Sequence, residues 1–186
     1  MAAPASPLTQ LNSPAQMSGA KSPHPLSGDI GRYRLHVLAM NVADVVTSIG
    51  GLIFDRAMAG WDVTVEVERN IGREADRPIR ILGGRVATLL AGPDGAGGAS
   101  RPHVLAVATD VFVSNEAVRR RVRAARNANA TDVLLWGRRR PPALNCRLVP
   151  VRHRPSAAAQ VFKSHALAAG GAFVTDPAEE GFYSMT

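Results

Sequence analysis

Hydrophobic and polar residues follow two different periods along this chain, and the two alternate from residue 32 onward. The segment RLHVLAM (34–40) is an apolar run typical of a buried strand. The segment DVTVEV (62–67) alternates with period two, as a half-buried strand does. Between them the apolar residues recur at helical spacing, which predicts a helix beginning near Asp44. This part of the chain is therefore predicted to run strand, helix, strand.

The same alternation continues to the end of the chain. Asp76 is a candidate N-cap, and Pro78 suits the first turn of a helix that continues to residue 92. Ser114-Asn115 is a second candidate cap. The other predicted elements are a loop (93–100), a strand (103–113), a helix to residue 130, a strand (132–137), an edge strand (146–153), a helix (156–171) and a short strand (172–176).

Strands that alternate with helices of this length indicate βαβ units. The predicted fold is α/β: a small doubly wound, mainly parallel sheet with helices on both faces. It occupies 31–176 as a single domain, because the whole chain has only 186 residues. Residues 177–186 are predicted to be an acidic C-terminal tail.

Residues 1–30 have a different composition from the rest. They contain five prolines, three of them in Ser-Pro pairs, and almost no large apolar side chains. Such a segment buries too little surface to offset the entropy cost of ordering, so a disordered arm is predicted. The arm is a tether or a site of phosphorylation, or it has no function and translation begins later, for instance at Met17.

The glycine pairs Gly50-Gly51 and Gly83-Gly84 raise the question of phosphate binding. A phosphate loop needs glycines directly after a strand, where they open a helix. Both pairs instead fall inside predicted helices. We therefore predict that they allow a close approach of helix to sheet, and that they do not bind phosphate.

The segments GGLIFDRAMAGWDVTV and DRPIRILGGR together resemble a group of uncharacterised proteins from GC-rich actinobacteria. The resemblance covers about the first half of the folded region and includes no catalytic motif. It implies a bacterial source and no activity, and the cofactor stays unknown.

Catalytic motifs give little support for a specific reaction. The chain has no Walker sequence, nucleophile elbow, H-E-x-x-H or C-x-x-C motif. Cys146, His153 and His165 lack the spacing of a structural zinc site, so neither a metal site nor a catalytic residue is predicted. With one cysteine, no membrane-length apolar run and no secretory signal, we predict a soluble cytoplasmic protein without membrane contact.

Polar residues follow several predicted strands. In an open parallel sheet, ligands bind beyond the carboxyl ends of the strands. Three of those ends lie near Glu68 and Asn70, Gly137 and Arg138, and Thr175 and Asp176. Residues at two further ends are predicted to form a ligand pocket: Asn41, Asp44, Thr109 and Asp110. The alternative is that these residues only end strands and cap helices.

One helical residue, Arg56, falls within the predicted apolar stripe. An arginine at the end of a helix usually lays its stem on apolar surface and keeps its charged group in water. That interpretation is favoured here over a buried arginine that holds an anion.

Charge is distributed unevenly. Twenty of the 22 basic residues are arginine. Residues 31–100 have eight arginines and eight acids, whereas 101–163 have twelve arginines and one lysine against three acids, a net charge of +10. Such an asymmetry indicates an anionic partner.

The predicted helix from residue 116 carries much of that charge. With Val118 and Val122 facing the core, four arginines fall on the opposite face, and Arg121 lies beside the apolar stripe. Three more follow in a loop beside Trp136. The predicted anion or nucleic-acid site is Arg119, Arg120, Arg123, Arg126, Arg138, Arg139 and Arg140. The alternative is a solvated face in an arginine-rich proteome.

Three functions follow from these features. The first is a non-catalytic protein that binds nucleic acid or another polyanion, without sequence specificity, through the arginine face. The second is a small Rossmann-like enzyme or ligand sensor with a pocket at the strand ends. The third is a scaffold for a protein partner.

Overall fold

A computed structural model describes most of the folded region. The described residues are 32–68, 76–89, 101–128, 130–137, 147–171 and 179–185. The predicted arm (1–30), the loop (93–100), the short strand (172–176), Asn70, Arg138, Arg139, Arg140 and Cys146 lie outside them.

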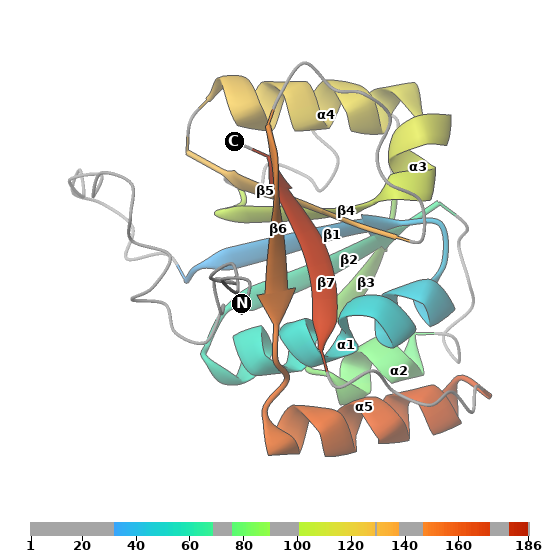
Figure 1. Cartoon of the computed structure of the whole chain (residues 1–186). Coiled ribbons are helices and arrows are strands. Elements are labelled where there is room, and N and C mark those ends of the chain that lie inside the picture. Colours follow the sequence, from blue (N-terminus) through green and yellow to red (C-terminus); the bar gives the residue numbers. More distant parts are fainter. Residues whose placement is uncertain are drawn as a thin grey trace, which may run out of the picture.

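Seven strands form one sheet in the order β3-β2-β1-β4-β5-β7-β6 (Figure 1). The strands are β1 (Arg34–Ala39), β2 (Asp62–Val67), β3 (Arg85–Thr88), β4 (Val104–Ala108), β5 (Asp132–Trp136), β6 (Leu148–His153) and β7 (Glu180–Met185). The first five pair in parallel, while β7 pairs antiparallel with both β5 and β6. The predicted mainly parallel α/β fold is confirmed, and β6 is at an edge as Pro150 indicated.

The helices cover the two faces of this sheet in separate groups. On one face lie α1 (Val42–Met58), α2 (Arg77–Ile81) and α5 (Ala157–Ala169), with α5 outside α1 and α2 (Figure 1). The opposite face carries α3 (Thr109–Ser114) and α4 (Glu116–Asn127). Helices on both faces are what a buried parallel sheet requires, since its strands are apolar on both sides.

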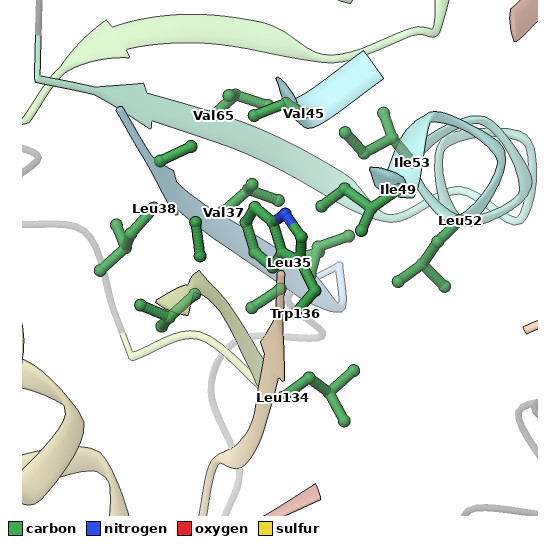
Figure 2. Packing of buried hydrophobic residues seen from close by; sticks show 14 of the residues in the cluster. Leu35, Val37, Leu38, Val45, Ile49, Leu52, Ile53, Val65, Leu134 and Trp136 are labelled. Carbon is green, nitrogen blue, oxygen red and sulfur yellow. The ribbon is translucent and has the colours of Figure 1, made fainter. Parts of the chain in front are cut away.

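The main core lies between α1 and the sheet. Val45, Ile49 and Ile53 project from α1 towards Val37 and Val65 on β1 and β2, and all five are at most 1% exposed (Figure 2). This is the helical stripe that the sequence predicted.

Among the described residues, no helix combines the length and hydropathy needed to cross a bilayer.

The predicted helix from Asp76 to residue 92 is wrong. The helix ends at Ile81, and β3 follows at Arg85. Gly83 has φ +81°, a conformation that glycine adopts without strain, and a Cβ there would lie 2.8 Å from the Cβ of Ala57. Gly83-Gly84 therefore makes a turn against α1, so the chain leaves the helix and enters the sheet.

The predicted strand 103–113 is also too long. It ends at Ala108, and the chain turns directly into α3, which buries Val111 and Phe112. In so short an apolar run, hydrophobic periodicity does not distinguish a strand from a buried helix. Asn115 then caps α4 as predicted, accepting hydrogen bonds from the amides of Ala117 and Val118.

The prediction of an acidic tail over 177–186 is wrong, because Glu180–Met185 form β7, which lies between β5 and β6 in the sheet. Two acids of this segment have partners elsewhere in the chain. Glu179 forms an ion pair with Arg152 at 2.9 Å, and Glu180 is 1% exposed. Pairing with distant strands cannot be detected from local composition.

Candidate functional site

The parallel strands place three of the predicted pocket residues around one end of the sheet. Asn41 follows β1 and caps α1, where its side-chain oxygen accepts a hydrogen bond from the amide of Asp44 at 2.8 Å. Asn41 is exposed. The cap keeps the start of α1 next to the carboxyl ends of β1 and β4.

Asp44 is the residue that joins α1 to β5 at this end. Its Oδ2 accepts a hydrogen bond from Nε1 of Trp136 at 3.3 Å, and its Oδ1 accepts one from the hydroxyl of Ser48 at 3.2 Å. The indole is buried, whereas the Asp44 residue is only partly buried. The carboxylate is thus fixed in orientation and remains accessible from one side.

Thr109 has a structural role at the same end. Its hydroxyl donates to the backbone carbonyl of Trp136 at 2.7 Å, and the residue is 4% exposed. Gly137 has φ +139°, and a Cβ there would lie 3.3 Å from Thr109. The threonine therefore fixes the exit of β5 and has little surface to offer a ligand.

The fourth predicted residue, Asp110, is exposed at the start of α3. Its Oδ1 accepts a hydrogen bond from the amide of Val111 at 2.7 Å. After β2, Oε1 of Glu68 accepts a hydrogen bond from the side chain of Asn115 at 3.3 Å. These side chains extend the polar surface from β2 to β4.

The described surface at this end is acidic. It carries Asp44, Glu68, Asp110 and Glu116, and two arginines, Arg119 and Arg123, pair with Glu116. The hydrogen bond from Arg119 lowers the pKa of Glu116. The site thus presents hydrogen-bond acceptors more than donors. Within the described ranges, no group of three His, Cys, Asp or Glu residues is placed to hold a metal ion.

The arginines of α4 do not form one free cluster. Arg119 Nε donates to Oε2 of Glu116 at 2.8 Å, and its Nη1 donates to the carbonyls of Phe112 and Val113. Arg120 and Arg123 are exposed, and Arg126 is partly buried. Arg123 also lies 3.6 Å from Glu116, so within the described residues Glu116 pairs with two of the predicted anion-site arginines. The anion site itself stays a prediction.

Arg121, which the sequence placed beside the apolar stripe, forms an internal ion pair. Its two terminal nitrogens lie 2.6 and 2.8 Å from the two carboxylate oxygens of Glu66 on β2. The Nδ1 atom of His36 lies 3.3 Å from the same carboxylate. Burial raises the pKa of Glu66, but the bonds from Arg121 and the adjacent His36 ring outweigh it and leave the pKa below its usual value.

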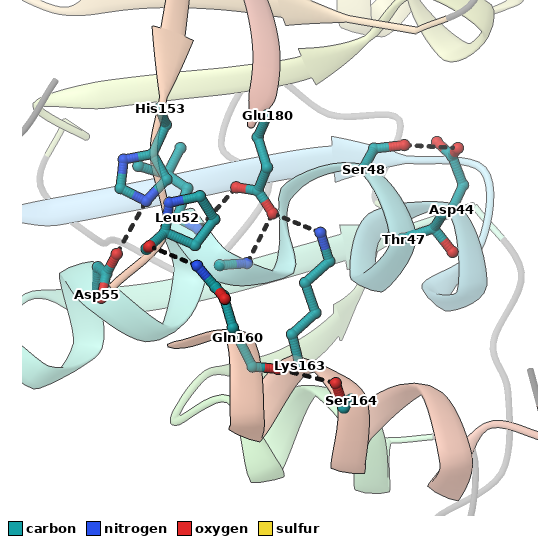
Figure 3. A network of polar contacts seen from close by, with 12 residues as sticks. Asp44, Thr47, Ser48, Leu52, Asp55, His153, Gln160, Lys163, Ser164 and Glu180 are labelled. Atoms are coloured by element: carbon teal, nitrogen blue, oxygen red, sulfur yellow. Dashed lines mark hydrogen bonds and ion pairs between the residues drawn. The ribbon is translucent and has the colours of Figure 1, made fainter. Parts of the chain in front are cut away.

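A second buried carboxylate, that of Glu180, lies against the glycine pair Gly50-Gly51 and shows why small residues are needed there (Figure 3). Glu180 on β7 binds Nζ of Lys163 at 2.8 Å and accepts hydrogen bonds from the amides of Gly51 and Leu52 at 2.8 and 2.9 Å. A Cβ on Gly51 would lie 2.6 Å from Cγ of Pro155. The pair therefore allows close packing, but mainly against Lys163 and Pro155 and not against the sheet as predicted. The amides of Gly51 and Leu52 bind a carboxylate of the protein itself.

A Ser-His-Asp group lies nearby, and the sequence analysis did not find it. Asp55 binds His153 Nε2 at 2.9 Å and the hydroxyl of Ser156 at 2.6 Å (Figure 3 shows the histidine contact). Catalysis needs the histidine between serine and aspartate, but here both contact the aspartate. Because Ser156 also caps α5 through the amide of Ala159, this group fixes α5 to α1.

The pKa of Asp55 follows from the same contacts. Burial raises it, while the hydrogen bonds from His153 and Ser156 lower it by more, so the carboxylate stays ionised. His165, the other histidine considered as a metal ligand, is exposed on α5.

Comparison with known proteins supports the fold assignment. No protein-family model and no curated protein sequence matches the chain. Among solved structures, it is similar to the A40926 pseudoaglycone deacetylase Dbv21, with a TM-score of 0.56 and 13% identity over 84% of this chain and 98% of the other. It is also similar to a deacetylase of teicoplanin biosynthesis solved with teicoplanin, with a TM-score of 0.53 and 14% identity over 82% and 98%. At this identity the similarity establishes a shared α/β fold.

Proposed function

We propose that this protein binds a small polar molecule at the carboxyl ends of β1, β4 and β5, and that Asp44 is its main anchor. The observation that carries the proposal is the oriented carboxylate of Asp44, held by Trp136 and Ser48 at that end. A carboxylate whose position is already fixed loses little entropy when it accepts a ligand donor.

The charge of the site indicates the class of ligand. In the described part of this end, Asp44, Glu68 and Asp110 follow three neighbouring strands, so a phosphate group would meet carboxylates and be repelled. Hydroxyl and amino groups would instead find acceptors. We therefore infer a ligand rich in hydrogen-bond donors, such as a sugar or amino sugar.

Two structural neighbours suggest which reaction to test first. They have the same α/β fold and are deacetylases, one of the A40926 pseudoaglycone and one in the biosynthesis pathway of teicoplanin. They make a small-molecule enzyme the first activity to test for this chain, with an N-acetylated amino sugar as the first substrate class.

The test is a thermal-shift screen of sugars, amino sugars, N-acetylated amino sugars, sugar phosphates and nucleotides. A ligand present at about 100 times its Kd stabilises the folded state by about 2.7 kcal/mol, so a hit gives a clear rise in Tm. For hits that are N-acetylated, release of acetate then separates an enzyme from a sensor.

The matched variants are Asp44→Asn and Asp132→Asn. Asp44→Asn removes the charge but keeps the shape, and we expect affinity to fall about 10- to 100-fold, as for a hydrogen bond to a charged group. Asp132→Asn makes the same change at the opposite end of β5 and should leave affinity unchanged. Preference for phosphorylated ligands, or equal affinity of wild type and Asp44→Asn, would contradict the proposal.

A further inference from the structure

The amino ends of the strands carry an aromatic cluster that is separate from the proposed ligand site. Tyr33 precedes β1, Trp61 precedes β2 and His103 precedes β4. The rings of Tyr33 and Trp61 are stacked, with centroids 5.0 Å apart and planes inclined by 24°. His103 lies against the same tyrosine at 4.7 Å, tilted by 57°. Three neighbouring strands thus place their aromatic residues together.

The backbone fixes this cluster in position. The carbonyl of Tyr33 accepts a hydrogen bond from the amide of Asp62 at 2.8 Å. The amide of Arg34 donates to Nδ1 of His103 at 3.1 Å, and the carbonyl of Arg34 accepts from the amide of His103 at 3.0 Å. The aromatic surface is therefore preformed.

Arg56 supports the cluster from within. Its guanidinium carbon lies 4.8 Å from the centroid of the Trp61 ring, which is a cation–π contact, and the residue is only 7% exposed. The expectation that its charged group stays in water is wrong, because Trp61 covers it. Burial lowers the pKa of Arg56, while Asp55 acts in the opposite direction.

Tyr33 remains open to solvent despite these contacts. It is 56% exposed, so part of its ring is accessible to a ligand. An exposed aromatic ring held flat by a stacked neighbour is the arrangement that proteins use to stack an unpaired base.

Among the described residues, the charge at this end is opposite to that at the carboxyl ends. Arg32 and Arg34 flank Tyr33, and Arg101 lies two residues before His103. Two acids lie nearby: Asp62 is paired with Arg85 at 2.7 Å, and the amide of Asp132 donates to the carbonyl of His103 at 2.9 Å. An excess of arginine beside exposed aromatic rings complements a chain of phosphates that carries unpaired bases.

We propose that the Tyr33–Trp61–His103 surface binds single-stranded nucleic acid. One base stacks on Tyr33, and Arg32 and Arg101 contact the flanking phosphates. A duplex is disfavoured as the partner because its base faces are already stacked and unavailable to Tyr33. The contact is independent of the ligand site around Asp44, so either proposal can fail alone.

The experiment is fluorescence anisotropy of the full chain with a labelled oligothymidylate of about 15 nucleotides, within the range of site sizes known for single-strand binding proteins. We expect binding that weakens steeply with salt. Tyr33→Leu keeps an apolar side chain but removes the ring, and should weaken binding about 5- to 100-fold. Tyr33→Phe keeps the stack and should bind like wild type.

The arginines are tested by the salt dependence. Each phosphate contact contributes about −0.7 to the slope of log affinity against log salt for a single strand. The double variant Arg32→Gln/Arg101→Gln should therefore make the slope shallower by about 1.4. The matched control is Phe162→Leu, which removes another exposed aromatic ring, on α5. Thermal melting checks that each variant is folded.

Several results would overturn the proposal. They are no binding at low salt, equal affinity for duplex and single strand, equal affinity for a mononucleotide, or unchanged affinity in Tyr33→Leu. Loss of binding in Arg120→Gln/Arg123→Gln with none in Tyr33→Leu would also overturn it, because that result assigns the contact to α4.

Discussion

The two faces of the sheet each bury a glutamate, and the two residues are satisfied in different ways. Glu180 lies beneath α1 and α5, and its side chain and that of Lys163 are both 0% exposed. Two backbone amides of α1 complete its hydrogen bonds. Glu66 lies on the other face, where Arg121 binds both of its oxygens and keeps 12% of its own side chain exposed.

The difference shows how to interpret charge in this protein. On the α1 face, glycines bring backbone amides to the carboxylate, and the cluster is closed to water. On the α4 face, the arginine-rich helix α4 places Arg121 against the buried Glu66 and leaves other arginines exposed. A charged residue here has to be assigned to its partner before any functional role is argued from it.

The largest expected effect comes from breaking the closed cluster. Lys163→Met leaves Glu180 buried without its cation, which for a buried pair costs about 3–5 kcal/mol of unfolding free energy. Denaturant unfolding measures the loss. Ser164→Ala, at the exposed neighbouring position, is the control and should change stability by less than about 0.5 kcal/mol. A loss in Lys163→Met as small as this would mean that the pair contributes little.

The next effect tests the close approach that brings the amides to Glu180. In Gly51→Ala the new methyl group would lie 2.6 Å from Pro155, so α1 has to shift away from the segment that joins β6 to α5. We expect a loss of about 2–3 kcal/mol, as for other overpacked sites. Gly181→Ala, where a Cβ meets nothing within 4 Å, is the matched control. Equal stability of the two variants would contradict the packing argument.

Breaking the pair on the α4 face should cost less. Arg121→Met removes the cation from Glu66, but the arginine is near the surface, so water can reach the carboxylate through the space that is vacated. We expect a loss of about 1–2 kcal/mol. Arg120→Met makes the same change one position earlier on the exposed face and should have almost no effect. If Arg121→Met cost as much as Lys163→Met, the contrast between the two faces would be lost.

The smallest effect concerns pH. The pKa of Glu66 is lowered on folding, so the unfolded chain binds its proton more readily than the folded protein does. This residue therefore stabilises the fold above the usual glutamate value of 4.5, and its contribution is lost as the pH falls through the folded pKa. Glu66→Gln should flatten this part of the acid profile in urea unfolding, and exposed Glu68→Gln should not.

The chemistry at the strand ends shows how far sequence reasoning reached. Asn41 and Asp44 were found because strands and helices alternate, and parallel strands place their carboxyl ends together. Thr109 was found by the same rule, but its hydroxyl is used by the carbonyl of Trp136. The position of a residue follows from its element, whereas its availability depends on a neighbour far away in the sequence.

The aromatic surface was missed for a related reason. Tyr33, Trp61 and His103 are separated by dozens of residues, and each is an ordinary residue before a strand. Only the register of β1 with β2 and β4 brings the three together. A rule that assigns binding to the carboxyl ends also directs attention away from this end.

The sequence by itself determined the α/β class, most strands, the cap at Asn115 and the packing role of Gly50-Gly51, because hydrophobic period and capping chemistry are local. The tertiary structure decided the strand order, the place of β7, the two buried ion pairs and the grouping of Tyr33 with Trp61. Those features depend on contacts between distant segments, and such contacts produce no local periodic pattern in the sequence.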